Sequence, residues 1–143
     1  MTVAAILTNK GPEVVSARPD QTLETAAKLM TERRIGSVLV REGDEVIGIL
    51  SERDIVRALA AQGAAALGMS VSSAMTREVV FGHPADTVDR VLGLMTERRI
   101  RHLPVKDGGR LIGLVSIGDV VKKRIEDVEQ EAEGLRAFVH GAG

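Results

Sequence analysis

The sequence contains no cysteine, no tryptophan and no tyrosine, and it has only two phenylalanines among 143 residues. The absence of cysteine excludes a disulfide scaffold, a thiolate metal site and a cysteine nucleophile. It also fits a reducing compartment, and we expect a cytoplasmic protein. Hydrophobic residues nevertheless make up 44% of the chain. We therefore expect a folded domain with a core of Val, Ile, Leu, Ala and Met.

The chain also has no excess of charge and no long apolar run. Its 19 basic and 20 acidic residues give a formal charge of −1, which excludes a general electrostatic field for a nucleic-acid polymer or a membrane surface. No charge-free run approaches the ~18 residues that span a membrane, and the apolar start is too short for a secretory signal. Three scattered histidines, His83, His102 and His140, lack the spacing of metal ligands, so we expect no metal.

An internal repeat organises the sequence. The heptapeptide LMTERRI occupies residues 29–35 and again 94–100, a shift of 65 residues. Matches in the same register flank it on both sides, and a three-residue slip further upstream aligns Leu7–Thr8 with Met75–Thr76. We therefore expect a first repeat over residues 1–62, a second over 63–124 and a helical tail over 125–143.

Each repeat predicts the same order of elements: strand, helix, strand, strand, helix. In the first copy an apolar pair, Val14–Val15, is followed by a helix start at Thr22, two short β-rich runs and a second helix start at Ser51. One copy exposes too much apolar surface to stand alone, so the two copies are expected to pack sheet against sheet. Residues 60–71 are expected to be a connection of small residues. The predicted fold class is α+β.

The tail has its own pattern. From Val121 the apolar residues fall at steps of four and three, at positions 121, 125, 128, 132, 135 and 139. This spacing predicts an amphipathic helix with one narrow stripe. The stripe allows two interpretations, a helix that folds back on its own domain or the seam of a dimer, and the sequence does not choose between them.

A duplicated Ser-x-x-Asp motif, Ser51–Asp54 and Ser116–Asp119, stands where a buried strand runs into a helix. Its simplest interpretation is a capping box, which satisfies the free N–H groups at a helix start. The same place can also bind a ligand, because a helix N-terminus attracts phosphate and a carboxylate can accept from ribose hydroxyls. The neighbouring Arg53 can neutralise phosphate.

Other chemistries fit less well. Ser116, His102 and Asp119 carry the letters of a hydrolase triad, but the spacing of a nucleophile elbow is missing and the first copy has no histidine. We expect no enzyme. The pairs Arg33–Arg34 and Arg98–Arg99 are expected to end helices, where cations complement the helix dipole, and not to bind nucleic acid.

The repeat, its order of elements, the Pro-x-x-Thr before the first helix and the Gly-h-h-Ser-x-x-Asp before the second (h, apolar) together resemble a tandem pair of CBS domains, or Bateman module. The resemblance covers about residues 2–124. It implies two β-α-β-β-α repeats related by a pseudo-two-fold axis, followed here by the C-terminal helix. It also implies a sensor that binds adenine nucleotides (AMP, ADP, ATP, NAD or S-adenosylmethionine) in clefts between the copies.

The resemblance also assigns roles to residues. Asp54 and Asp119 would hold ribose and Ser51 and Ser116 would meet phosphate. The clefts would be composite, with Asp119 facing Val15 and Ile35, and Asp54 facing Val80 and Ile100. The adenine would therefore rest on aliphatic side chains. The phosphates would be read by Arg53, Arg101 and His102, whereas the first copy has Gly36 and Ser37 in place of the last two.

The resemblance implies a non-enzymatic regulatory module that forms a homodimer and acts on a separate, unknown protein. The alternative is a structural or adaptor protein whose clefts are non-functional and whose serines serve only as caps.

Overall fold

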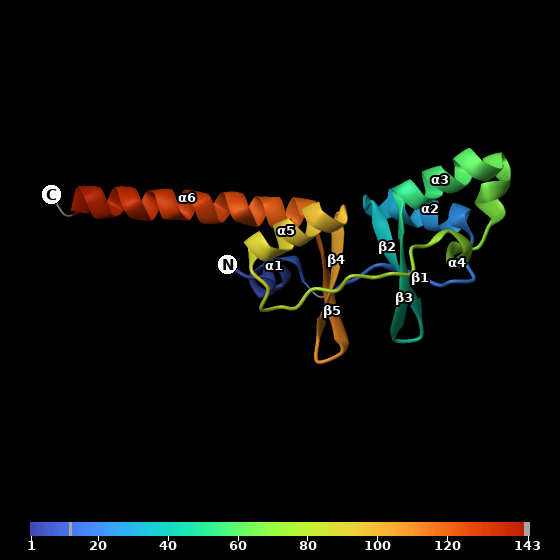
Figure 1. Ribbon diagram of the computed structural model, residues 1–143, viewed down its shortest axis with the longest axis horizontal. Helices are drawn as coiled ribbons and strands as arrows, with labels where there is room; N and C mark the ends of the chain where they lie inside the picture. Colours follow the sequence, from blue (N-terminus) through green and yellow to red (C-terminus); the bar gives the residue numbers. More distant parts are fainter. Residues whose placement is uncertain (12, 142–143) are drawn as a thin grey trace. The chain divides into compact units, whose positions relative to one another are not determined.

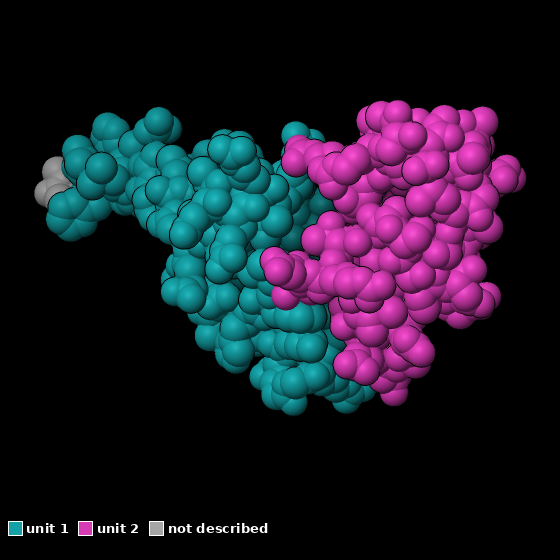
Figure 2. Space-filling model, turned by 45° about the vertical axis from the view of Figure 1, so that its right-hand side comes forward, with its two compact units in different colours: residues 1–13, 80–143 teal, residues 14–79 magenta. Residues whose placement is uncertain are grey.

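A computed structural model describes residues 1–11 and 13–141. The chain forms two compact units, one made of residues 14–79 and one that joins residues 1–13 to residues 80–143 (Figure 2). The sequence repeat and the compact unit therefore have different boundaries. Residues 1–13 begin the first repeat in the sequence but belong to the unit that holds the second.

The unit of residues 14–79 contains a three-stranded sheet in the order β1-β2-β3. β1 pairs parallel with β2, and β2 and β3 form an antiparallel hairpin. One helix precedes the hairpin in the chain, and the other helices of this unit follow it (Figure 1). The elements in chain order are β1 (Ser16–Ala17), α2 (Leu23–Arg33), β2 (Ser37–Glu42), β3 (Glu45–Ser51), α3 (Glu52–Gln62), a 3-10 helix (Gly63–Gly68) and α4 (Val71–Ala74).

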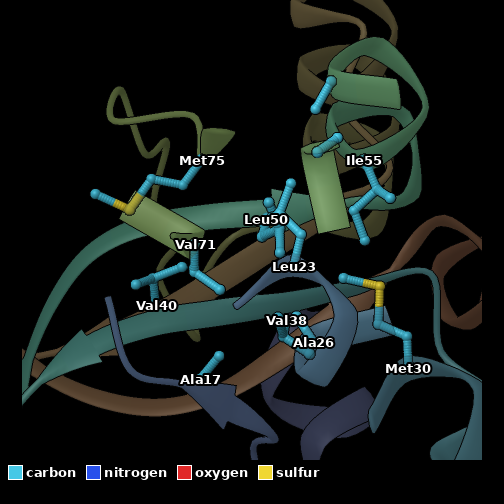
Figure 3. Close-up of a cluster of buried hydrophobic side chains, with 12 residues drawn as sticks. Ala17, Leu23, Ala26, Met30, Val38, Val40, Leu50, Ile55, Val71 and Met75 are labelled. Carbon is cyan, nitrogen blue, oxygen red and sulfur yellow. The ribbon is translucent and has the colours of Figure 1, made fainter. Parts of the chain in front are cut away.

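The core of this unit is aliphatic, as the composition predicts. Leu23 of α2 and Leu50 of β3 are fully buried beside Val71 of α4, and Ile55 of α3 packs onto the same cluster (Figure 3). Ala66 and Val71 come from the segment expected to be only a connection. That segment is helical and supplies core residues, so it is part of the fold of this unit.

The other unit is built around the hairpin of β4 (His102–Asp107) and β5 (Arg110–Ser116), with α5 (Val88–Arg98) before it and α6 (Ile117–Gly141) after it. Its remaining helix is α1 (Val3–Lys10). Val3 and Ile6 of α1 are buried in one cluster with Leu103 and Val115 of the hairpin. α1 is therefore a core element of this unit.

The two units repeat one close packing contact at a glycine. A Cβ atom on Gly48 would lie 2.6 Å from Met75 Sδ and 3.0 Å from the carbonyl oxygen of Thr76. A Cβ atom on Gly113 would lie 2.5 Å from Leu7 Cδ2. Met75 and Leu7 are the residues that the three-residue slip aligns. Gly48 of the first repeat is thus packed by a residue near the start of the second, and Gly113 of the second by a residue near the start of the first.

The expected first strand is shifted in one copy and nearly lost in the other. β1 covers Ser16–Ala17, and the pair Val14–Val15 lies just before it. In the second copy the structure has only an isolated bridge from Gly82 to Val105. The N–H of Leu39 donates to Val15 O at 3.4 Å, but the equivalent of Leu39 is Pro104, which has no N–H to donate.

The helix boundaries follow the sequence signals. Thr22 and Thr87 cap α2 and α5, because their hydroxyls accept from the N–H groups of Thr25 and Arg90. Both helices end at a left-handed arginine, Arg34 or Arg99, each with φ 54°. The helix ends expected at the two arginine pairs are therefore confirmed.

The tail is not a separate helix. α6 runs without interruption over 25 residues, so the second helix of the second repeat continues directly into it. Figure 1 shows its C-terminal half extending past α5 and α1 of its own unit. Leu135, Phe138 and Val139 are between 62% and 73% exposed, so this part does not fold back on its own domain. Residues 142–143 of the expected tail lie outside the described part.

The mixed α/β fold with two repeats and a C-terminal helix is as expected from the sequence.

Candidate functional site

The first Ser-x-x-Asp motif forms a complete capping box at the start of α3. The N–H of Asp54 donates to Ser51 Oγ at 3.2 Å, and the N–H of Ser51 donates to Asp54 Oδ2 at 2.9 Å. The N–H of Glu52 donates to the carbonyl oxygen of Gly36 at 2.9 Å. The N-terminal turn of α3 is therefore held both by its own motif and by the start of β2.

The second motif repeats this arrangement at the start of α6. The N–H of Asp119 donates to Ser116 Oγ at 3.1 Å, and the N–H of Ser116 donates to Asp119 Oδ2 at 2.8 Å. The N–H of Ile117 donates to the carbonyl oxygen of Arg101 at 2.7 Å. The capping interpretation of the motif is thus confirmed in both copies.

The surroundings of the two aspartates differ. The Asp54 side chain is only 6% exposed and lies 3.6 Å from Arg57 Nη1. The hydroxyl of Thr76 donates to its Oδ1 at 3.4 Å. Because its neighbours surround it, Asp54 has little surface left for a ligand in this structure.

Asp119 is more open and has a cation beside it. Its side chain is 29% exposed, and Lys10 Nζ of α1 donates to its Oδ2 at 2.6 Å. The hydrogen bonds from Lys10 and from the N–H of Ser116 both go to Oδ2. The Asp119 carboxylate is therefore more accessible to a ligand than the carboxylate of Asp54.

The charge state of Asp119 follows from these contacts. Burial alone would raise the pKa of Asp119, but the hydrogen bond and charge of Lys10 and the N–H of Ser116 outweigh it. The pKa of Asp119 consequently lies below its ordinary value of 3.8. The group is a carboxylate at neutral pH.

A hollow of about 180 Å³ surrounds this carboxylate between α1 and the first turns of α6. Three of the residues that line it are lysines, against two carboxylates, so the hollow has a net positive charge. The lining residues are Ile6, Asn9, Lys10, Asp119, Lys122, Lys123 and Glu126.

The starts of β2 and β4 bring further predicted residues to the same sheet ends. Ser37 lies opposite Ser51 in the hairpin register, and His102 lies opposite Ser116. Ser37 is 1% exposed, and within the described residues its hydroxyl has no hydrogen-bond partner. His102 is half-buried. The two copies therefore place different chemistry at equivalent positions.

The remaining predicted residues divide by polarity. Val15 and Ile35 are half-buried against the core of one unit, and Val80 and Ile100 against the core of the other. Arg53 and Arg101 are exposed.

Phe81 directly follows Val80, and Lys106 Nζ lies 4.0 Å from the centre of its ring. One of the aliphatic residues predicted to contact adenine, Val80, therefore has an aromatic residue as its neighbour in the chain.

Each unit gathers its own share of the predicted site at one end of its sheet. The groups expected to face one another across the repeats, such as Asp119 with Val15 and Ile35, belong to different units, and their pairing stays a prediction. The unit of residues 14–79 holds Val15, Ile35, Gly36, Ser37, Ser51, Arg53 and Asp54, and the other unit holds Val80, Ile100, Arg101, His102, Ser116 and Asp119.

The partners of both aspartates were not predicted from the sequence. Thr76 contacts Asp54, and Lys10 contacts Asp119. The signal was present in the three-residue slip, which aligns the segment of Thr8 with that of Thr76. The residues after Met75 pack beside the first copy. By this alignment, the residues after Leu7 take the equivalent place beside the second copy.

Two absences hold for the described residues. No group of three or more His, Asp or Glu side chains could hold a metal ion. No helix in this part of the chain is both long and apolar enough to cross a membrane.

Comparison with known proteins identifies the family. The CBS domain matches residues 3–61 and 71–126. The CBS domain-containing protein CBSX3, mitochondrial, of Arabidopsis thaliana is 35% identical over 150 residues, which cover 98% of this chain and 72% of the relative. The crystal structure of a CBS-domain containing protein of Agrobacterium tumefaciens is 47% identical with a TM-score of 0.84, covering 86% of this chain and 92% of that one.

A third relative was solved with ligands. The CBS domain pair of protein MJ0100, in complex with 5′-methylthioadenosine and S-adenosyl-L-methionine, is 26% identical with a TM-score of 0.77 and covers 89% of this chain and 98% of that one. The two matched ranges each contain one copy of the internal repeat and its Ser-x-x-Asp motif. This chain therefore belongs to the CBS-domain family, as a tandem pair of CBS domains.

Proposed function

We propose that this protein is a non-catalytic regulatory module that binds an adenosine-containing ligand, with the Asp119 motif as the site that is occupied first. The observation that carries the proposal is the open carboxylate of Asp119 in a hollow lined by lysines. A ligand that joins two vicinal hydroxyls to a phosphate matches this combination. An adenine nucleotide has both groups.

The chemistry can be assigned group by group. The ribose hydroxyls donate to Asp119, whose side chain is 29% exposed, and the phosphate meets the Ser116 hydroxyl and the N-terminal end of α6. Lys10 and the exposed Lys122 supply the positive charge that a phosphate needs. AMP, ADP, ATP and NAD all fit this description.

The related pair from MJ0100 supports the adenosine part of the proposal, since both of its ligands contain an adenosyl group. In the present chain the adenine would rest on Val15 and Ile35, or on Val80 and Ile100, in composite clefts. Arg53, Arg101 and His102 would contact phosphates. These assignments extend the family resemblance to particular residues of this chain.

The Asp54 motif is proposed as the weaker site. Asp54 is nearly covered and already accepts from Thr76, and Gly36 and Ser37 stand where the second copy has a cation and an imidazole. Ser37 offers there a hydroxyl that has no hydrogen-bond partner in the described part of the chain. A ligand would have to displace Thr76 before its ribose could reach Asp54.

The regulatory role is proposed to work by population shift. A ligand that binds one arrangement of the module more tightly favours that arrangement and so changes the surface seen by a partner. We propose a homodimer in the cytoplasm that acts on a separate, unidentified protein. The competing function is a structural or adaptor protein with non-functional clefts, and the completed capping boxes at Ser51 and Ser116 favour it.

Isothermal titration of the full chain with AMP, ADP, ATP, NAD, S-adenosylmethionine and 5′-methylthioadenosine tests the proposal. We expect heat with at least one nucleotide and none with any of them after Asp119→Asn, which retains an oxygen acceptor for the cap but loses the charge. Asp54→Asn is the matched control and should leave this first binding event intact. An absence of heat with all six ligands would establish the adaptor function instead.

The phosphate assignment has its own test. Lys122→Gln removes an exposed cation from the hollow without touching Asp119 or its cap. It should weaken AMP binding by roughly tenfold and leave adenosine or 5′-methylthioadenosine binding unchanged. Equal weakening of charged and uncharged ligands would show that Lys122 does not contact phosphate.

A further inference from the structure

The C-terminal part of α6 presents an apolar stripe that its own unit leaves exposed. Val121, Ile125 and Val128 are 42–54% exposed, and Leu135 and Val139 are more than 60% exposed. The stripe extends over residues 121–139, or about 27 Å of helix. Six apolar residues that share one face of a solvent-facing helix indicate a surface that is covered by another helix.

Two helices of the same unit lie beside the N-terminal half of α6, one on each side of the stripe. α1 lies along the face of Lys122, Lys123 and Glu126. On the side of α5, Arg124 Nε lies 3.4 Å from Asp89 Oδ1. The stripe lies between these two covered faces, and every residue from 133 to 140 is exposed. Among the described residues, the stripe is therefore partly accessible at Val121–Val128 and widely accessible at Leu135–Val139.

The spacing of the stripe is that of a coiled-coil seam. Steps of four and three alternate along its whole length, which is the heptad pattern of positions a and d. Gly134 falls outside the seam. β-Branched residues at two of the three a positions and Leu at a d position favour two strands. The a positions are Ile125, Ala132 and Val139, and the d positions are Val121, Val128 and Leu135.

The apolar pattern alone allows two orientations, because it is symmetric about residue 130. The flanking charges distinguish them. In a parallel pair each g residue faces the e residue five positions later on the other helix. Arg124 then faces Glu129 of the second copy, and Glu131 faces Arg136 of the second copy, so both pairs have opposite charges.

In an antiparallel pair e residues face e residues and g residues face g residues. Glu129 would then face Glu129, Glu131 would face Glu131, and Lys122 would face Arg136. All three juxtapositions have like charges and oppose association. The complementarity of the flanking charges therefore selects a second copy of this helix, in parallel orientation.

We propose that α6 forms a parallel two-stranded coiled coil with α6 of a second copy of this chain, in register along residues 121–139. The seam joins the two copies through the helix that begins at the Asp119 motif. This inference rests on the homodimer of the proposed function and names the surface that forms it. The coiled coil does not depend on nucleotide binding, so its test and the ligand titrations can fail separately.

Cysteine cross-linking of the full chain tests the register, since the sequence has no cysteine of its own. Ala132→Cys places a thiol at an a position, where it faces its own counterpart only in the parallel register. Ala137→Cys, on the outer face of the same helix, is the matched control. We expect Ala132→Cys to form the disulfide-linked dimer at least about tenfold faster than Ala137→Cys. Equal rates would overturn the parallel register.

Sedimentation velocity tests the seam and its charges. We expect a wild-type dimer that Val128→Asp dissociates at least about a hundredfold, with circular dichroism reporting that the variant remains folded. Arg136→Glu should weaken the dimer about tenfold, and Glu131→Arg/Arg136→Glu should restore it. A wild-type monomer, a dimer indifferent to Val128→Asp, or a dimer tightened by Arg136→Glu would each overturn the proposal.

Discussion

Lys10 Nζ donates to Asp119 Oδ2 at 2.6 Å, although the two residues lie 109 positions apart in the chain. The contact ties the last residue of α1 to the first turn of α6. It also gives the carboxylate of the second motif a cation that its counterpart Asp54 lacks at this distance. One ion pair therefore links the N-terminal helix both to the stability of its unit and to the candidate ligand site.

This ion pair predicts a pH-dependent contribution to stability. Because Lys10 depresses the pKa of Asp119 in the folded protein, the stabilisation is fully present above the ordinary value of 3.8 and is lost as the pH falls through the lower folded pKa. Lys10→Met should therefore cost under about 1 kcal/mol at pH 7, given the partial exposure of both groups. The difference from wild type should vanish in strong acid.

Urea unfolding between pH 2 and pH 7 measures this difference. Lys28→Met, which removes the exposed partner of Glu24 at 3.5 Å, is the control and should change stability little at any pH. A cost of Lys10→Met that persists unchanged at pH 2 would show that the residue stabilises the unit by packing and not by charge.

The close contacts at the two glycines predict unequal costs. Gly48→Ala would push a methyl group against Met75 and against the backbone of Thr76, which cannot swing away. We expect a loss of about 1–3 kcal/mol. Gly113→Ala meets only the tip of the Leu7 side chain, which can change rotamer, so its cost should be smaller. Thermal unfolding of both variants checks the order, and the reverse order would contradict the packing described for residues 75–76.

The left-handed arginines predict a stabilising substitution. Arg99 ends α5 with φ 54°, a conformation that glycine adopts without the steric cost of a Cβ atom. Arg99→Gly should therefore raise the free energy of unfolding by up to about 1 kcal/mol. Arg98→Gly, one residue earlier and inside the helix, should lower it by about as much. Chemical denaturation of this pair isolates the backbone effect, since both variants lose the same side chain.

The two aspartates should also differ in their contribution to stability. Asp54→Ala removes a cap and a buried carboxylate that accepts from the N–H of Ser51 and the hydroxyl of Thr76, so we expect a loss of about 2 kcal/mol. Asp119→Ala removes a cap on a more exposed turn and should cost about 1 kcal/mol. Equal costs in calorimetric melting would contradict the difference in burial between the two motifs.

Much of this fold could be predicted from the sequence because its signals are local. The repeat of residues 29–35, the helical spacing after Thr22 and Thr87 and the Ser-x-x-Asp caps depend on residues within a few positions of one another. Hydrogen bonds at helix ends form between such near neighbours, so their residue types reveal them. The absence of a first strand near Val80 was harder to predict, because it results from Pro104, which lies in the neighbouring strand β4.

The sequence by itself determined the two repeats, their order of elements, the caps and the apolar stripe of the tail. Only the tertiary structure decided that α1 belongs with the second repeat, that Lys10 reaches Asp119 and that the stripe of α6 is exposed. The reason is physical. Periodicity shows that a face is apolar or a residue is charged, but which partner it meets depends on how distant segments share one core.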